Sequence, residues 1–271
     1  MAKMFFDRIK AGESLTFDFI GDSVTMGTIH CPQEKTYVAR FTHYIAASLD
    51  GYTVRRYDGI PLAGSAEPMK CFEGPIVCRK GTSSQTLDVV KNGIGGSTVK
   101  KATERPQDYT GLLPNGRRHD FVFLMFGIND ALSYDKGKYV SAEQFKENYK
   151  RLTDILKADN PDVTIVITSA TTPTVLSHER SPKYVSEEQK ILVCSIEEHV
   201  ERTKELARQE GFAYIDTHKL WAEHYQEDAE HHGHGDWLVG YDSCHPSPIA
   251  SDVMGKFVAE QFLLLAKNGT V

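Results

Sequence analysis

The fold class is decided by the stretch Leu15-Thr16-Phe17-Asp18-Phe19-Ile20-Gly21-Asp22-Ser23. Its first six residues alternate and are rich in strand formers, which predicts a β-strand, and the last three predict a sharp turn. Residues 36–49 then carry apolar side chains at the spacing of one helical face. A strand that passes through a turn toward a helix is the opening unit of an α/β fold.

The same alternation of strand and helix continues along the chain. Further strands are predicted at residues 52–57, 87–91, 121–126, 163–168 and 212–215, and further helices at 142–158, 185–209 and 248–266. The run at 121–126 is apolar throughout, which is typical of a strand buried on both faces of a parallel sheet. We therefore predict an α/β fold with a mostly parallel sheet.

Residues 58–86 interrupt this alternation, since they are rich in Gly, Pro and Ser and show little periodicity. We expect a single domain, residues 1–271, that carries this segment as an insertion with a hairpin around Pro75-Ile76-Val77-Cys78. Loops of this length usually serve binding or assembly, so a homo-oligomer is also expected.

Composition and charge exclude several classes of partner. The net charge of −6 is spread along the chain and no Lys/Arg tract opposes it, which argues against nucleic acid and anionic membranes. No apolar stretch is long enough to span a membrane, and the first eight residues lack a secretory signal. The five cysteines favour free thiols, although Cys71 and Cys78 could pair. We expect a cytoplasmic protein unless a signal peptide has been removed.

Four short motifs contain the candidate catalytic residues. Each motif lies in a loop or just after a predicted strand. They are Gly21-Asp22-Ser23-Val24, Asn92-Gly93-Ile94-Gly95-Gly96-Ser97-Thr98, Gly127-Ile128-Asn129-Asp130 and Asp242-Ser243-Cys244-His245-Pro246. Open α/β sheets place their sites outside the carboxyl ends of the strands, which is where such motifs would meet. Together the motifs supply what serine-dependent ester hydrolysis requires.

Ser23 is the candidate nucleophile. A serine hydroxyl needs a neighbouring base, and a turn between strand and helix would expose its oxygen. Two other interpretations fit this motif alone: Asp22 or Ser23 could cap the helix that follows, or the turn could hold a phosphate as in flavodoxin-like proteins. The phosphate interpretation leaves Asp242 and His245 unexplained.

The remaining motifs supply the groups that would assist Ser23. His245 is the candidate base, and Asp242, three residues earlier, could orient its imidazole. Gly96 offers a backbone N–H with room around it, and Asn129 offers a side-chain amide, so both are candidate oxyanion donors. Taken singly, these motifs also fit a polar turn, a tight turn and a helix cap.

Read jointly, the four motifs resemble those of the SGNH hydrolases, also called the GDSL esterase/lipase family. The resemblance extends from Leu15 to the final helix and implies a three-layer α/β/α sandwich with a flavodoxin-like sheet. It implies a triad of Ser23, His245 and Asp242, an oxyanion hole formed by Ser23, Gly96 and Asn129, and no cofactor. Val24 stands where the family name has leucine, and residues 58–86 are longer than the family usually has before its glycine motif.

The substrate class is indicated only by aromatic residues near the motifs. Tyr134, Trp237 and Tyr241 could stack on a sugar, and with Asp22 they are the candidate substrate-binding residues; Trp237 could equally anchor the core. The motifs look similar to those of intracellular acetylxylan esterases. We therefore expect a serine esterase acting on a small ester such as an acetylated sugar.

Two alternatives to this function remain open. One is a lysophospholipase or thioesterase acting on longer acyl chains, and the other is a non-catalytic carbohydrate-binding protein on the same fold. The histidines between His224 and His234 match no tetrahedral metal pattern, so no metal is expected.

Overall fold

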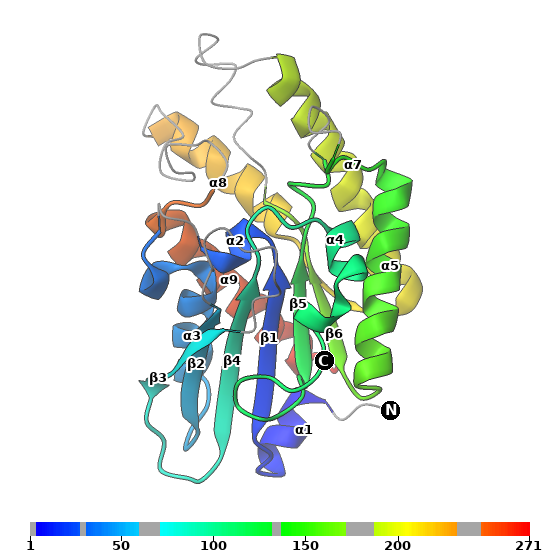
Figure 1. Cartoon of the computed structure of the whole chain (residues 1–271). Helices are drawn as coiled ribbons and strands as arrows, with labels where there is room; N and C mark the ends of the chain where they lie inside the picture. Colours follow the sequence, from blue (N-terminus) through cyan, green and yellow to red (C-terminus); the bar gives the residue numbers. More distant parts are fainter. Residues whose placement is uncertain (1–3, 28–30, 60–70, 132–136, 172–186, 232–244) are drawn as a thin grey trace.

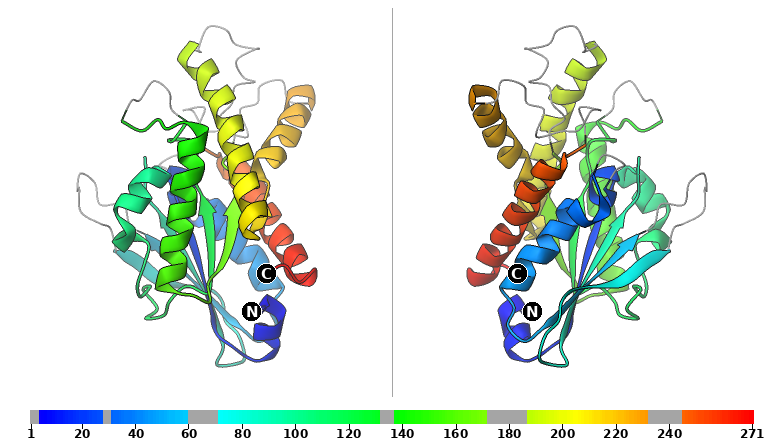
Figure 2. Two further views of the ribbon diagram at one scale, coloured as in Figure 1. Left: turned by 90° about the vertical axis from the view of Figure 1, so that its right-hand side faces the viewer. Right: turned by 90° about the vertical axis from the view of Figure 1, so that its left-hand side faces the viewer.

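The computed structural model describes residues 4–27, 31–59, 71–131, 137–171, 187–231 and 245–271. A central sheet lies between two layers of helices (Figures 1 and 2). The sheet has seven strands: β1 (Leu15–Gly21), β2 (Thr53–Gly59), β3 (Phe72–Arg79), β4 (Thr86–Gly93), β5 (Phe121–Met125), β6 (Thr164–Thr168) and β7 (Ala213–Ile215). The predicted three-layer α/β/α architecture is confirmed.

The strand order explains where a site can form. The order is β3-β2-β4-β1-β5-β6-β7, and every neighbouring pair is parallel except β2 and β3. The five neighbouring strands β4-β1-β5-β6-β7 follow the flavodoxin-like order, and β2 and β3 extend the sheet beyond β4. Because β4 and β5 lie on opposite sides of β1, the chain reverses direction there and leaves a crevice at the carboxyl end of β1.

Helices cover both faces of the sheet. The helical elements are α1 (Phe5–Lys10), α2 (Ser23–Met26), η1 (Gln33–Lys35), α3 (Tyr37–Ala47), α4 (Val99–Glu104), η2 (Pro106–Asp108), α5 (Ala142–Asp159), α7 (Glu187–Glu210), α8 (Thr217–His231) and α9 (Pro248–Lys267). The first layer holds α1, α3 and α9, and the second holds α4, α5 and α7 (Figure 2). Thr36, Ser141 and Ser247 cap the amino ends of α3, α5 and α9, as serine and threonine commonly do.

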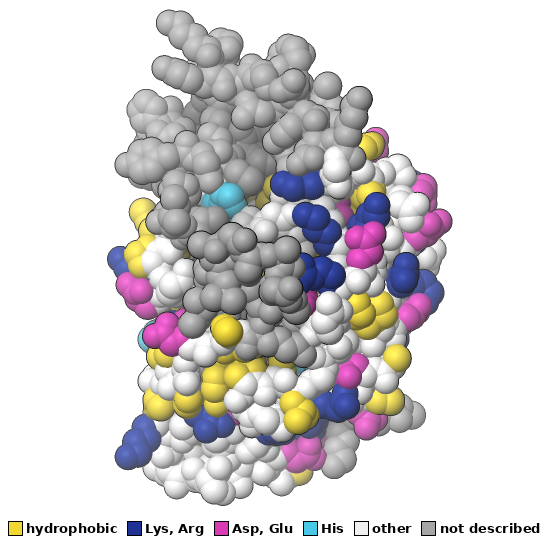
Figure 3. Space-filling model, viewed as in Figure 1, with side chains coloured by type: hydrophobic (Ala, Val, Ile, Leu, Met, Phe, Trp, Pro, Cys, Tyr) yellow, Lys and Arg dark blue, Asp and Glu magenta, His cyan; other side chains and the backbone are white. Residues whose placement is uncertain are grey.

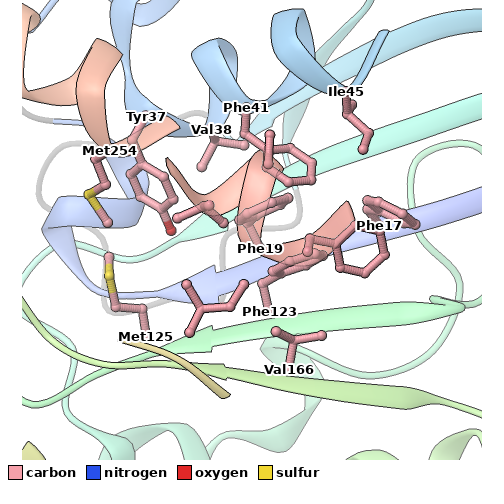
Figure 4. Close-up of a cluster of buried hydrophobic side chains, with 14 of the residues drawn as sticks. Phe17, Phe19, Tyr37, Val38, Phe41, Ile45, Phe123, Met125, Val166 and Met254 are labelled. Carbon is pink, nitrogen blue, oxygen red and sulfur yellow. The ribbon is translucent and has the colours of Figure 1, made fainter. Parts of the chain in front are cut away.

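The first helical layer packs on the sheet through aromatic rings. Phe17 and Phe19 of β1 point toward α3 and α9, and Phe19 stacks on Phe123 of β5 with ring centroids 4.3 Å apart (Figure 4). Phe41 of α3 and Phe262 of α9 meet the same group edge-on. Each buried phenylalanine stabilises the fold by roughly 1.5–3 kcal/mol, so the strand that leads to Ser23 is firmly held.

The predicted insertion at residues 58–86 contains strand β3, which is antiparallel to β2 at the edge of the sheet. Residues 75–78, where a hairpin was expected, instead lie inside β3, and residues 60–70 between β2 and β3 lie outside the described part of the chain. Cys71 and Cys78 are both exposed and free, so the disulfide considered for them does not form. The described residues include no helix whose length and apolar character would let it cross a lipid bilayer.

Among the described α-helices, four lie outside the predicted helical ranges. They are α1, α2, α4 and α8. Both α1 and α4 are six residues long, too short to show a helical period clearly.

Candidate active site

The candidate nucleophile and base are in contact. His245 Nε2 lies 2.7 Å from Ser23 Oγ, a hydrogen-bond distance, although the two residues are 222 positions apart in the sequence. Ser23 is the first residue of α2 at the carboxyl end of β1, and His245 lies just before α9 (Figure 1). Ser23 is half-buried, so its hydroxyl lies at the edge of the protein interior.

Two glycines allow α2 to lie directly against the sheet. A Cβ on Gly93 of β4 would come within 2.2 Å of Met26 N and 2.7 Å of Asp22 O. A Cβ on Gly21 of β1 would lie 2.3 Å from Thr25 Oγ1. The position of Ser23 therefore depends on glycine, which has no side chain, at Gly21 of β1 and Gly93 of β4.

Asp22 links this turn to the loop after β5. One carboxylate oxygen accepts from Val24 N at 2.9 Å, which caps α2, and the other accepts from Asn129 Nδ2 at 3.4 Å. Burial raises the pKa of Asp22 to about 6, although the Val24 N–H, His245 and Asn129 oppose the shift. The cap interpretation is thus correct for Asp22, and it coexists with the contact between Ser23 and His245.

The glycine-rich loop is anchored to the end of β1. Ile94 N donates to Gly21 O at 3.0 Å, and Ser97 N donates to Ile94 O at 3.1 Å. Gly96 has φ +69°, in the left-handed region that glycine adopts at little cost. This turn carries Gly96 across the carboxyl edge of the sheet between β4 and α4.

Asp130 joins the glycine-rich loop to the loop that carries Asn129. Its two carboxylate oxygens lie 3.0 and 3.3 Å from Val99 N, the first residue of α4, and the Asp130 side chain is fully buried. Burial raises the pKa of Asp130 well above its ordinary value, and the nearby charge of Asp22 adds to the shift, whereas the Val99 N–H opposes it. The Asn129-Asp130 motif does include a helix cap, but the helix begins 31 residues earlier in the chain.

A lysine lies beside the glycine-rich loop. Lys138 Nζ is 3.9 Å from the position that a Cβ on Gly96 would take. Several Lys and Arg side chains are visible on this face near α4 (Figure 3). Positive charge at this position would favour negative charge on an oxygen bound next to Gly96.

A small, partly open pocket adjoins Ser23 and His245. Its lining residues are Ser23, Val24, Gly27, Cys31, Thr36, His245, Pro246 and Ser251. The Cys31 thiol lies 3.6 Å from Ser251 Oγ, and burial raises its pKa.

A buried group of charges lies near the carboxyl ends of β2 and β4. Lys91 is fully buried, its ammonium contacts the Gln33 side chain, and Lys91 Nζ lies 3.8 Å from Asp58 Oδ1. Arg56 donates two hydrogen bonds to the Asp58 carboxylate, at 2.8 and 2.9 Å. Burial lowers the pKa of Lys91 to about 8, and the charge of Asp58 opposes that shift. This cluster was not predicted, because in the sequence Lys91 only ends a predicted strand.

Several predicted site residues lie outside the described part of the chain. They are Tyr134, Trp237, Tyr241 and Asp242. Of the histidines near Trp237, His231 is described only as backbone at the end of α8, and His232 and His234 are not described. Among the residues whose side chains are described, no group of three or more His, Cys, Asp or Glu could hold a metal ion.

Comparison with known proteins identifies a family and a shared fold. A model of the GDSL-like lipase/acylhydrolase family matches residues 76–252, more than half of the chain. No curated protein matches the sequence.

Solved structures resemble the whole chain. A lipase/acylhydrolase from Enterococcus faecalis is 15% identical over 94% of this chain and 96% of its own, with a TM-score of 0.57. An acetyl xylan esterase, AlAXEase, is 17% identical over 92% of this chain and 98% of its own, with a TM-score of 0.58. A peptidoglycan O-acetylesterase is 11% identical over 97% of this chain and 95% of its own, with a TM-score of 0.64. At such identities the likeness establishes the fold.

Proposed function

Since the chain belongs to the GDSL-like lipase/acylhydrolase family of carboxylic ester hydrolases, we propose that it removes small acyl groups, acetyl above all, from a carbohydrate. The observation that carries the proposal is the 2.7 Å approach of His245 Nε2 to Ser23 Oγ. A serine hydroxyl paired with an imidazole in this way is the activated nucleophile of acyl transfer.

The reaction begins when the Ser23 hydroxyl donates its proton to His245 Nε2 and Oγ attacks the ester carbonyl. His245 then protonates the departing alcohol, which leaves an acetyl group on Ser23. Water, activated by the same imidazole, releases acetate and restores Ser23. Asp242 is assigned the role of orienting the imidazole, because it precedes His245 by three residues in the same motif.

Three donors are assigned to the oxyanion that forms at the carbonyl. They are the backbone N–H groups of Ser23 and Gly96 and the side-chain amide of Asn129. One N–H of that amide donates to Asp22 Oδ2, which leaves the other available for the substrate. Asp22 is only 2% exposed, so we assign it to holding Asn129 and α2 rather than to binding the sugar.

One observation favours a short acyl group on a carbohydrate. Two of the structures with the same fold are named for acetyl groups on polysaccharides, xylan in one case and peptidoglycan in the other. Tyr134, Trp237 and Tyr241 remain the candidates for stacking on the sugar.

The test is hydrolysis of p-nitrophenyl esters from acetate to octanoate by wild type, Ser23→Ala and His245→Ala. Acetate should be the fastest substrate, and Ser23→Ala should lose roughly 10⁴-fold or more in kcat. Ser48→Ala, at an exposed serine after α3, is the control and should match wild type.

The other outcomes separate the alternatives. A preference for octanoate would indicate a lysophospholipase or thioesterase. Wild-type activity in Ser23→Ala, together with no labelling of Ser23 by an organophosphonate, would leave Ser23 as part of a helix terminus and reject the mechanism.

A further inference from the structure

The oxyanion donors assigned above come from loops after three different strands. Ser23 follows β1, Gly96 follows β4, and Asn129 follows β5. An oxyanion hole works only if its donors are held in a fixed arrangement before the charge develops. Some contact must therefore fix the Gly96 loop relative to the Asn129 loop.

Asp22 supplies only part of that connection. Through its contacts with Val24 N and Asn129 Nδ2, it joins α2 to the loop after β5. The Gly96 loop is tied to β1 at its start, where Ile94 N donates to Gly21 O. Its far end, where the chain enters α4, needs a separate attachment.

Asp130 provides this attachment. It follows Asn129 directly, and both of its carboxylate oxygens contact Val99 N, three residues after Gly96. Its backbone is held as well, because Asp130 O accepts from Val140 N at 3.0 Å. The side chain is fully buried, so water does not compete for the contact with Val99.

We propose that Asp130 is a positioning residue that holds the Gly96 and Asn129 oxyanion donors at a fixed separation. This inference rests on the proposed function. Asp130 does not touch the substrate; it acts through the Val99 amide, and thereby through the loop that carries Gly96.

Thr98 offers a matched control at the same helix end. Its Oγ1 accepts from Lys101 N at 3.1 Å, so it also caps α4, and it is 2% exposed. Unlike Asp130, it belongs to the glycine-rich segment itself and makes no bridge to the Asn129 loop through this bond. Thr98→Val therefore weakens the start of α4 and leaves the bridge in place.

The experiment compares Asp130→Ala and Thr98→Val in p-nitrophenyl acetate hydrolysis, with active enzyme counted by organophosphonate labelling of Ser23. Asp130→Ala removes both oxygens that accept from Val99 N and should lower kcat about 10- to 100-fold, since a displaced donor costs most in the transition state. KM should stay within about 2-fold. Thr98→Val should lower Tm by a few degrees and keep kcat within about 2-fold of wild type.

A second variant approaches the same bond from its donor. Val99→Pro removes the N–H at the first helical position, where proline is well tolerated, and should reproduce the kcat loss even if Asp130→Ala folds poorly. A kcat within about 3-fold of wild type in both folded variants would overturn the inference, as would an equal kcat loss in Thr98→Val.

These outcomes are distinct from failure of the proposed function. If wild type hydrolyses no ester, or if Ser23→Ala matches it, the proposed function fails and the role of Asp130 fails with it. If Ser23→Ala is inactive while both bridge variants keep their kcat, only the present inference fails.

Discussion

Replacing Gly93 with alanine should displace the nucleophile while leaving every proposed catalytic group in the sequence. The new Cβ would lie 2.2 Å from Met26 N, 2.7 Å from Met26 Cα and 2.7 Å from Asp22 O. All three atoms belong to the backbone of the turn and helix that carry Ser23, so no flexible side chain can move aside. The backbone of Gly93 itself is compatible with alanine, because its φ lies outside the left-handed region.

The size of the effect follows from these distances. Ordinary van der Waals contact begins at 3.4 Å, so α2 must retreat from β4 by about 1 Å. A misplacement of about 1 Å in a reacting group can cost roughly 100-fold in rate. Overpacking of this kind also costs about 1–3 kcal/mol of stability. We therefore expect Gly93→Ala to lose about 100-fold in kcat/KM and to melt several degrees lower.

The assay is p-nitrophenyl acetate hydrolysis together with thermal unfolding followed by circular dichroism. Gly95→Ala is the control, since its Cβ would approach only the flexible end of Met26, 3.2 Å away, and it should keep activity within about 3-fold. If Gly93→Ala matches wild type in both rate and Tm, the close packing of α2 on β4 does not position Ser23 and the reasoning is wrong.

The further predictions concern three buried polar groups. Burial raises the pKa of Asp22 from 3.8 to about 6, so Asp22→Asn should gain stability relative to wild type as the pH rises from 3.8 to about 6; urea unfolding at pH 4 and pH 7 measures this difference. As the pH falls from about 6 to 3.8, Asp22 becomes protonated and its hydrogen bond with Asn129 weakens, so kcat/KM of wild type should fall. A pH–rate profile that Asp22→Asn leaves unchanged would contradict this role of Asp22. Burial lowers the pKa of Lys91 from 10.5 to about 8, so Lys91→Met should be more stable than wild type at pH 7, by about 3 kcal/mol at most, and the advantage should shrink as the pH rises from 8 to 10.5. Tyr37→Phe removes a buried hydroxyl 3.0 Å from Thr25 Oγ1 and should cost about 1–2 kcal/mol in chemical denaturation, with no change in the m-value.

The parts of the fold that were predictable are those with a local signal. The run from Phe121 to Phe126 and the alternation from Leu15 to Ile20 reveal their strands directly, since side-chain periodicity needs no knowledge of distant residues. The helices predicted at residues 36–49 and 248–266 rest on the same kind of local signal.

What escaped prediction depends on residues far apart in the sequence. The ammonium of buried Lys91 contacts Gln33 and Asp58, and no residue near Lys91 in the sequence indicates either partner. The strand β3 is largely exposed at the sheet edge and forms by pairing with β2, so its own sequence shows little of it.

The candidate site divides in the same way. The motifs identified Ser23 and His245, and the structure brings these two side chains together. The bridge from Asp130 to Val99 was not predicted, because a side chain that caps a helix 31 residues earlier leaves no local pattern. The parts assigned to Asp242, Tyr134, Trp237 and Tyr241 remain predictions.

The two ends of the described chain meet at the side of the sheet opposite the candidate site. Phe5 N donates to Val271 O at 3.2 Å, whereas Ser23 lies at the carboxyl end of β1 (Figure 1). A solid support attached through either end would therefore bind the molecule on the side opposite the candidate active site and leave that site facing the solution. Polymeric substrates, which cannot diffuse into a crowded resin, would still reach an enzyme immobilised in this orientation.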